Sequence, residues 1–231
     1  MIIVLYRHFV KNGADALDCY TKAMSSAVQN QSQPLGLTLK SGDEYSNLRV
    51  SAVRTITSAK GVYFKACKLA SVDLSTLSLP QLTLRECLIS NSEAAGLDCN
   101  SGFFEHSTFG NTRASGVQMY ESKQKYVTYN GCKLDLANFS GSQLKKVRFE
   151  NCLLYNVDFT NVLFDGVTFM GCELEKTNFS NARVKGLDLR SSRLSEVIGS
   201  ASLKGALVTY DQLLELAPSL AQDIGLVIKE D

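Results

Sequence analysis

A period of five residues limits how this chain can fold more than any other feature. From Phe64 to Leu194 every fifth residue is apolar except Gln124, and nine of the eleven phenylalanines fall on these 27 positions. Smaller apolar residues, mostly valine, alanine, leucine and cysteine, lie two positions before many of these centres. A helix repeats every 3.6 residues and a half-buried strand alternates every two. The pattern therefore excludes long helices and long plain strands across this region.

A very short strand followed by a corner explains the period. A centre and the residue two before it point to the same side of a strand, and the next two residues can turn the chain. Many second corner positions hold glycine or asparagine, such as Asn91, Gly116 and Asn151, which tolerate turn conformations. Four corners close a square of twenty residues, so the sequence predicts an all-β solenoid with a quadrilateral coil.

The cysteines follow the same square. Cys132, Cys152 and Cys172 recur at intervals of twenty, which would suit a metal site, a disulfide ladder or one column of a stacked fold. Stacking in one dry inner column gives no tetrahedral arrangement for zinc. Seven cysteines without an export signal favour reduced thiols. We therefore expect no metal and seven free thiols.

The repeats themselves resemble a known family. CKLDLANFSGSQLKKVRFENC and NVDFTNVLFDGVTFMGCELEKTNFSNARVKGLDL closely resemble the pentapeptide-repeat proteins, whose pattern is roughly Ala/Cys/Val, Asp/Asn, Leu/Phe and two polar residues. The resemblance covers about residues 62–197. It implies a right-handed quadrilateral β-helix.

Three regions are expected along the chain. Residues 1–46 should hold a short strand, a helix at 12–30 and a linker, and the apolar start lacks the features of a signal peptide, which favours a cytoplasmic protein. Residues 47–198 should form the β-helix, with an irregular first coil. Residues 199–231 should form a helical cap or dimerisation tail, in which Thr209 and Gln212 make a capping box.

The tail leaves two alternatives open. An apolar stripe along its helix consists of Leu213, Leu214, Leu216 and Leu220. The tail resembles the C-terminal extension of bacterial pentapeptide-repeat proteins, and in the relatives that bind DNA gyrase such a helix joins two rods end to end. The stripe could therefore cap its own rod or form a homodimer, and the resemblance favours the homodimer.

The sequence shows no motif for catalysis. It has no glycine-rich phosphate loop, no CxxC pair, no HExxH and no Gly-x-Ser-x-Gly elbow. The only histidines are His8 and His106, and His106 falls on a predicted corner. We therefore expect no enzyme activity, no catalytic residues, no cofactor, no small-molecule substrate and no membrane insertion.

Charge differs between the four sides of the predicted coil, although the whole chain has a net charge of only +1. The side centred on Phe64 and on every twentieth residue after it holds eight basic and three acidic residues, and the basic ones are Lys65, Arg85, Lys123, Lys125, Lys145, Lys146, Arg183 and Lys185. The side centred on Leu79 holds only acidic charges, namely Asp98, Glu121 and Asp158. The rod should thus be electrically two-sided.

Two functions are consistent with such a rod. One is a non-enzymatic scaffold that binds another macromolecule, as solenoids generally do. The alternative, implied by the resemblance, is a mimic of duplex DNA that binds DNA gyrase and alters supercoiling or fluoroquinolone susceptibility. Near-neutral net charge and a basic side favour the scaffold with a protein partner.

Two details of the interior can also be predicted. Phe139, Phe159 and Phe179 should stack in one column, with Phe149 and Phe169 in an adjacent one. Gln124 stands at a centre position, so either the coil bulges there or the amide finds buried hydrogen-bond partners. We expect a local irregularity at this point.

Overall fold

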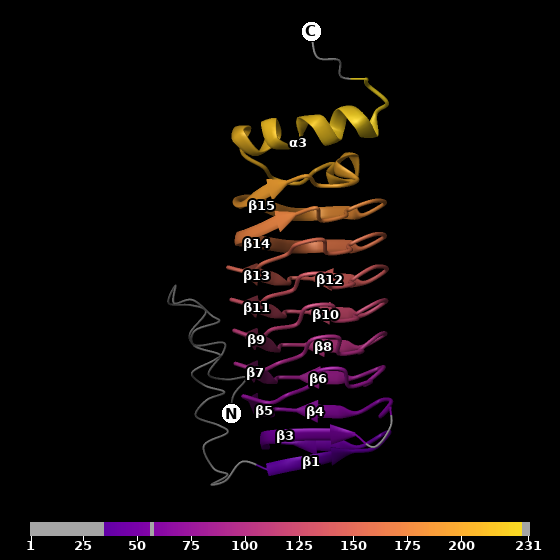
Figure 1. The fold of residues 1–231 in the computed structure, drawn as a ribbon, viewed down its shortest axis with the longest axis vertical. Helices are drawn as coiled ribbons and strands as arrows, with labels where there is room; N and C mark the ends of the chain where they lie inside the picture. Colours follow the sequence, from indigo (N-terminus) through magenta and orange to yellow (C-terminus); the bar gives the residue numbers. More distant parts are fainter. Residues whose placement is uncertain (1–34, 56–57, 228–231) are drawn as a thin grey trace.

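The chain folds into a rod of stacked coils with a helix lying across its C-terminal end (Figure 1). The computed structural model describes residues 35–55 and 58–227, and the helix expected at 12–30 lies outside them. The fifteen strands of the described part belong to a single parallel sheet. The predicted right-handed quadrilateral β-helix is confirmed, with about eight turns.

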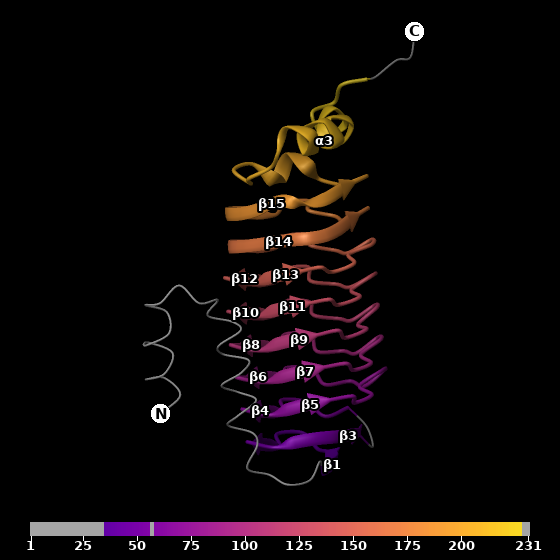
Figure 2. The ribbon, with the colours of Figure 1, turned by 90° about the vertical axis from the view of Figure 1, so that its left-hand side faces the viewer.

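Strands run along two adjoining sides of the square coil (Figure 2). One side contains β2 (Glu44–Ser46), β4 (Tyr63–Lys65), β6 (Thr83–Arg85), β8 (Phe103–Glu105), β10 (Lys123–Lys125) and β12 (Gln143–Lys145). The next contains β1 (Leu35–Leu39), β3 (Arg49–Thr55), β5 (Lys68–Ala70), β7 (Leu88–Ser90), β9 (Thr108–Gly110), β11 (Thr128–Asn130) and β13 (Arg148–Glu150). The long strands β14 (Leu163–Glu175) and β15 (Arg183–Ser195) run along both of these sides and continue onto a third. Single bridges such as Asp73 to Glu93 join the coils on the other two sides.

The corners explain why the period is five. Every fifth residue from 66 to 196, apart from Ser191, has a positive φ near the left-handed region. All the glycines and asparagines predicted at these corners adopt this conformation, for example Gly131 and Asn151. Backbone amides at the corners donate to carbonyl groups of the next coil, as Asn151 N does to Met170 O at 2.8 Å. Each coil is therefore held to the next on all four sides.

The apolar centres fill the interior. Of the 27 predicted centre positions, only Val184 is not fully buried. Phe139, Phe159 and Phe179 stack with centroid distances of 5.2 and 5.5 Å, and Phe149 stacks on Phe169 at 4.6 Å. The two predicted columns are in contact, since Phe139 meets Phe149 edge to face at 6.0 Å, but they come from opposite sides of the coil and not from adjoining ones. The reason is that positions ten residues apart are half a turn apart.

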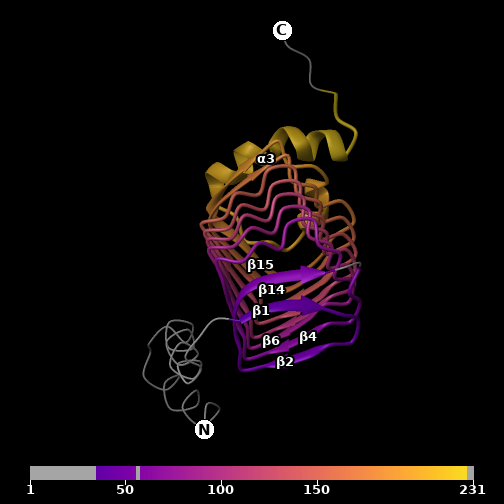
Figure 3. The same ribbon diagram turned by 60° about the horizontal axis from the view of Figure 1, so that its bottom comes forward.

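The β-helix begins before residue 47, the predicted boundary. Strands β1 and β2 precede it, and Tyr45 pairs in register with Phe64. The register between β1 and β3 shifts at Leu35 and Gly36, so the first coil is less regular than the others. Figure 3 looks obliquely at this N-terminal end of the rod, where β1 and β2 lie.

The irregularity expected at Gln124 does not occur. Strand β10 pairs with β8 and β12 in continuous register, so the coil neither gains nor loses a residue. The buried amide instead finds partners, because Tyr129 Oη donates to Gln124 Oε1 at 2.9 Å and Gln124 Nε2 donates to Ser122 Oγ at 3.1 Å. A satisfied polar group can replace an apolar one at a centre position without distorting the coil.

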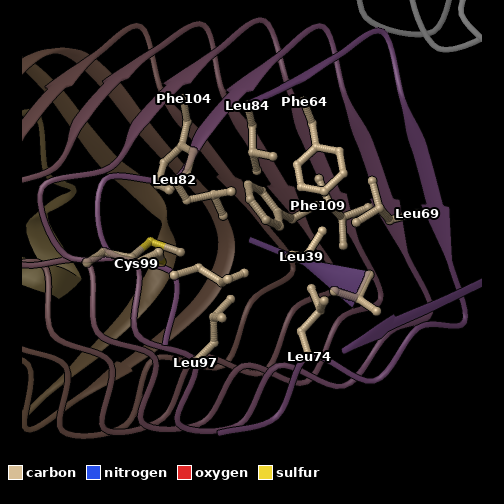
Figure 4. Close-up of a pocket in the computed structure, with 14 residues that line it drawn as sticks. Leu39, Phe64, Leu69, Leu74, Leu82, Leu84, Leu97, Cys99, Phe104 and Phe109 are labelled. Atoms are coloured by element: carbon tan, nitrogen blue, oxygen red, sulfur yellow. The ribbon is translucent and has the colours of Figure 1, made fainter. Parts of the chain in front are cut away.

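The N-terminal half of the core contains a small cavity. A cavity of about 20 Å³ lies among leucines and phenylalanines, with Leu84, Cys99 and Phe104 on its wall (Figure 4). Its lining is entirely apolar. A space of this size could enclose one water molecule but offers it no hydrogen-bond partners, so the cavity is a packing defect and not a binding site.

Candidate interaction surfaces

The side predicted to be basic forms a continuous charged column. We call it the basic side; it comprises residues 62–66 and the corresponding five residues of each later coil up to 182–186. Pairing between coils aligns one residue from each in the order Lys65, Arg85, Glu105, Lys125, Lys145, Asp165 and Lys185. Neighbouring strands in a sheet lie about 4.8 Å apart, so these charges form a closely spaced line along the rod.

The two acids in this column each lie between two cations. Glu105 is 3.5 Å from Arg85 and 3.7 Å from Lys125. Asp165 is 3.6 Å from Lys145 and 3.9 Å from Lys185. Ion pairs of this kind at a protein surface add little to stability. They hold the cations in line, and the column keeps an excess of three positive charges. The sequence analysis counted these acids on the basic side but did not place them between the cations. Aligning residues twenty positions apart would have shown that position.

The remaining predicted cations extend the column sideways. Lys123 and Lys125 lie in β10, and Lys145 and Lys146 lie on the next coil, which places four lysines on two successive turns. We call these four residues the lysine patch. Arg183 and Lys185 lie two coils further on, in β15. The structure therefore brings together the basic residues that the sequence predicted.

Aromatic rings border the lysine patch. Tyr126 stacks on His106 with a centroid distance of 4.7 Å, and Lys125 Nζ lies 5.3 Å from the Tyr126 ring centre. Arg85 lies over the outward ring of Phe103 at 5.3 Å. Burial lowers the pKa of His106, so this ring is neutral at neutral pH. The basic side thus combines cations with flat apolar surface.

The predicted acidic residues do not form a comparable line. Asp98 and Asp158 occupy one column but are separated by three coils, or about 14 Å, and both are partly buried. Each accepts a hydrogen bond from the backbone two residues on, at Asn100 and Thr160. Glu121 lies on a corner. The two aspartates therefore shape turns, a role that the sequence analysis missed.

The predicted apolar stripe of the tail divides into two halves. Helix α3 (Tyr210–Asp223) begins with the capping box of Thr209 and Gln212 and follows a short 3-10 helix, η3 (Ser200–Leu203). Leu216 is buried and Leu220 packs on the core, whereas Leu213 and Leu214 are exposed to 45% and 57%. Gln212 Nε2 also donates to Leu189 O at 2.6 Å. One half of the stripe therefore seals the rod, and the other faces outward.

The described cysteines belong to the interior. Cys67, Cys87, Cys99, Cys132, Cys152 and Cys172 are free and buried, and Cys19 lies outside the described residues. Cys152 Sγ donates to Tyr129 O at 3.4 Å, and burial raises the pKa of Cys99. Within residues 35–55 and 58–227, no three histidine, cysteine or acidic side chains are grouped to hold a metal ion. No helix in this same part is long and apolar enough to cross a membrane.

A regular parallel β-solenoid with a helical cap defines a class of repeat proteins. The model of the family of pentapeptide repeats matches eight copies, over residues 132–171 and 158–196. Residues 132–196 therefore consist of pentapeptide repeats, and the same fold continues through the coils that precede them. No curated protein matches the sequence.

Solved pentapeptide-repeat structures are among the matches. HetL, a protein involved in heterocyst differentiation regulation in the cyanobacterium Nostoc, is 16% identical, with a TM-score of 0.39 over 76% of this chain and 92% of HetL. Full-length QnrB1, a plasmid-mediated fluoroquinolone resistance protein, is 18% identical, with a TM-score of 0.32 over 84% of this chain and 100% of QnrB1. Likeness at this level concerns the fold alone.

Proposed function

We propose that this protein is a non-enzymatic scaffold whose basic side binds an acidic segment of another protein. The observation that carries the proposal is the in-register column of cations, which places the lysine patch on a flat and rigid surface. Charge complementarity on such a surface speeds association and selects partners of opposite charge. Solenoids commonly use their extended faces in this way.

Binding of fluorescein-labelled poly-L-glutamate, measured by fluorescence anisotropy at low salt, tests this proposal. Reversing the charge of Lys125, Lys145 and Lys146 to glutamate should weaken binding at least tenfold, because it changes the local charge by six units. Added salt should weaken wild-type binding, since the contact is electrostatic. Unchanged affinity after the reversal would contradict the proposal. Tighter binding to single-stranded DNA than to poly-L-glutamate would also contradict it, in favour of a nucleic-acid partner.

A matched control neutralises the opposite charges. Changing Asp98 and Asp158 to asparagine and Glu121 to glutamine should leave poly-L-glutamate binding intact. The turns should survive, because Asn138 and Asn178 accept the same backbone hydrogen bond in the same column. The control thus separates charge from structure.

The gyrase alternative depends on these same acids. A duplex mimic needs carboxylates displayed along the rod as phosphates are along DNA, but two of the three are partly buried in turns. A supercoiling assay with purified gyrase decides between the two functions. Inhibition that the acid-neutralised variant loses and the lysine-reversed variant keeps would establish the mimic instead.

The outward half of the apolar stripe supports a homodimer as a second part of the proposal. Tyr210, Leu213 and Leu214 are exposed on α3, and Ile224, Leu226 and Val227 follow with 61% to 82% of their surface exposed. Exposed apolar side chains at one end of a rod are suited to self-association. The resulting dimer would present two basic sides.

A further inference from the structure

The side of the coil opposite the basic side breaks its own repeat pattern at one place. This third side comprises residues 72–76 and the corresponding residues of each later coil. Its first outward column is charged in every coil but one, where Leu153 stands among Asp73, Glu93, Arg113, Lys133, Glu173 and Arg193. The second outward column holds small or acidic residues, except for Tyr155. Two apolar side chains therefore point outward from one five-residue unit.

A third exception lies beside them. Leu136 occupies a corner with φ 59°, and its backbone amide donates to Tyr155 O at 2.8 Å. A leucine is unfavourable in the left-handed region, and here 55% of its surface stays exposed. Leu153 and Tyr155 are exposed to 43% and 42%. These residues bring little stability to the rod, so their coincidence at one place points to recognition.

Two carboxylates lie next to these three residues. Glu173 pairs in register with Leu153, and Glu175 lies on the same coil, two residues along. Both side chains are exposed. Among the described residues, neither carboxylate has an ion pair within 4.0 Å, even though Arg193 pairs in register with Glu173. Two of the neighbouring cations are already paired, since Lys133 lies 3.2 Å from Asp135 and Lys176 lies 3.7 Å from Glu196. Lys176 Nζ also lies 5.6 Å from the centre of the Tyr155 ring, so this ring already contacts a cation.

We infer that Leu136, Leu153, Tyr155, Glu173 and Glu175 form a docking site, the Tyr155 patch, for an extended protein segment that carries apolar and basic side chains. Leu153 and Tyr155 face outward two residues apart, as do alternate side chains of an extended peptide. Tyrosine and leucine would supply the buried contacts and the two carboxylates would bind lysine or arginine. Because this patch and the basic side lie on opposite faces, one rod could hold two partners at once.

The probe for this site is a short fluorescein-labelled peptide of alternating leucine and lysine, followed by fluorescence anisotropy. The double variant Leu153→Ser with Tyr155→Ser should weaken binding at least tenfold, as loss of central contacts does. Glu173→Gln with Glu175→Gln should weaken it several-fold and reduce its salt dependence. Each variant should keep its melting temperature, because all four side chains are exposed. Unchanged affinity in the first variant would overturn the inference.

Two controls locate the site, and one comparison peptide defines the chemistry. The first control, Tyr120→Ser with Leu163→Ser, removes equally exposed apolar side chains from other sides of the coil. The second, Leu213→Ser with Leu214→Ser, removes the exposed leucines of α3. Neither control should change the affinity for the peptide. An equal loss in either control, or equal affinity for a serine and lysine peptide, would overturn the inference. The reversal of Lys125, Lys145 and Lys146 to glutamate, which tests the basic side, should not weaken binding of this peptide. The two proposals can therefore fail independently.

Discussion

Leu136, Tyr126 and Lys146 occupy left-handed corners, where glycine and asparagine are favoured. Thirteen of the left-handed corners between 66 and 196 carry neither of these residue types. The backbone hydrogen bonds between coils hold these residues in place, as Lys146 N does by donating to Asp165 O at 2.8 Å. Single corners therefore store strain that the stacked neighbours overcome.

The corner at Leu136 gives a direct test of this strain. Leu136→Asn should raise the free energy of unfolding by about 1 kcal/mol, because asparagine tolerates the left-handed conformation better than leucine. Chemical denaturation measures the change. Leu153→Asn, at an exposed position without a positive φ, is the control and should not stabilise the protein. Equal effects of the two changes would refute the strain argument.

Cys99 makes the stability of the fold depend on pH in the alkaline range. Burial, assisted by the charge of Asp98, raises the pKa of its thiol above the ordinary value of about 8.5. Above that pH the unfolded chain releases this proton while the folded chain keeps it. The contribution to stability is therefore fully present below pH 8.5 and is lost as the pH rises beyond it, by up to about 1.4 kcal/mol per pH unit.

The variant Cys99→Val isolates this effect. Valine has no titrating group, and the cavity beside Cys99 leaves room for its extra methyl group. Between pH 8.5 and 10, the free energy of unfolding should fall less steeply for the variant than for the wild type. Denaturation curves at several pH values measure both slopes, and identical slopes would show that Cys99 does not contribute.

At the scale of elements, each coil is stabilised by its neighbours. Phe159 touches Phe139 below and Phe179 above as stacked rings, and it meets Phe149 and Phe169 edge to face. Such aromatic pairs add to the free energy gained by burying the rings. The strands themselves are only three residues long over most of the rod. No coil could therefore persist alone, as is usual in solenoids.

Removing one ring should consequently weaken several coils. Phe159→Ala is expected to lower the free energy of unfolding by about 3–5 kcal/mol, through lost burial and the cavity left behind. Thermal or chemical melting measures the loss. Phe103→Ala removes the same side chain from an outward position and should cost much less. A melting curve unaffected by the Phe159 substitution would contradict the assigned packing.

At the scale of the whole molecule, the ends of the rod differ. Helix α3 covers the C-terminal coil through Leu216 and Gln212, and it exposes Leu213 and Leu214 on its other face. Parallel coils leave unpaired strand edges at both ends, and proteins commonly cover such edges. Here α3 meets this need and also creates the surface proposed for dimerisation.

Size-exclusion chromatography with light scattering tests that surface. The wild type is expected at twice the mass of one chain, and Leu213→Glu with Leu214→Glu should give the monomer, because two charges oppose burial of the apolar face. The double variant should stay folded, since neither side chain packs on the rod. Leu163→Glu on the basic side is the control and should stay dimeric. A monomeric wild type would dismiss this part of the proposal.

Much of this architecture could be predicted because its pattern is local and repeated. A centre such as Phe64, its smaller partner at Val62 and a corner residue recur in every unit, so each residue's environment follows from its place in the period. The basic side could be assembled from sequence for the same reason, since residues twenty apart become neighbours. Gln124 misled the prediction because its partner Tyr129, although near in sequence, meets it only in the closed interior.

The sequence by itself determined the square coil, the inner column of cysteines and the sides that carry positive and negative charge, because a period of five admits one arrangement of inward and outward side chains. Only the tertiary structure decided what depends on distances between particular side chains. It shows that Glu105 and Asp165 each lie between two cations. It also shows that Asp98 and Asp158 accept backbone hydrogen bonds in turns, and that one half of the apolar stripe of α3 packs on the rod while the other half is exposed. Side-chain contacts across coils depend on rotamers and packing, which a repeat pattern does not specify.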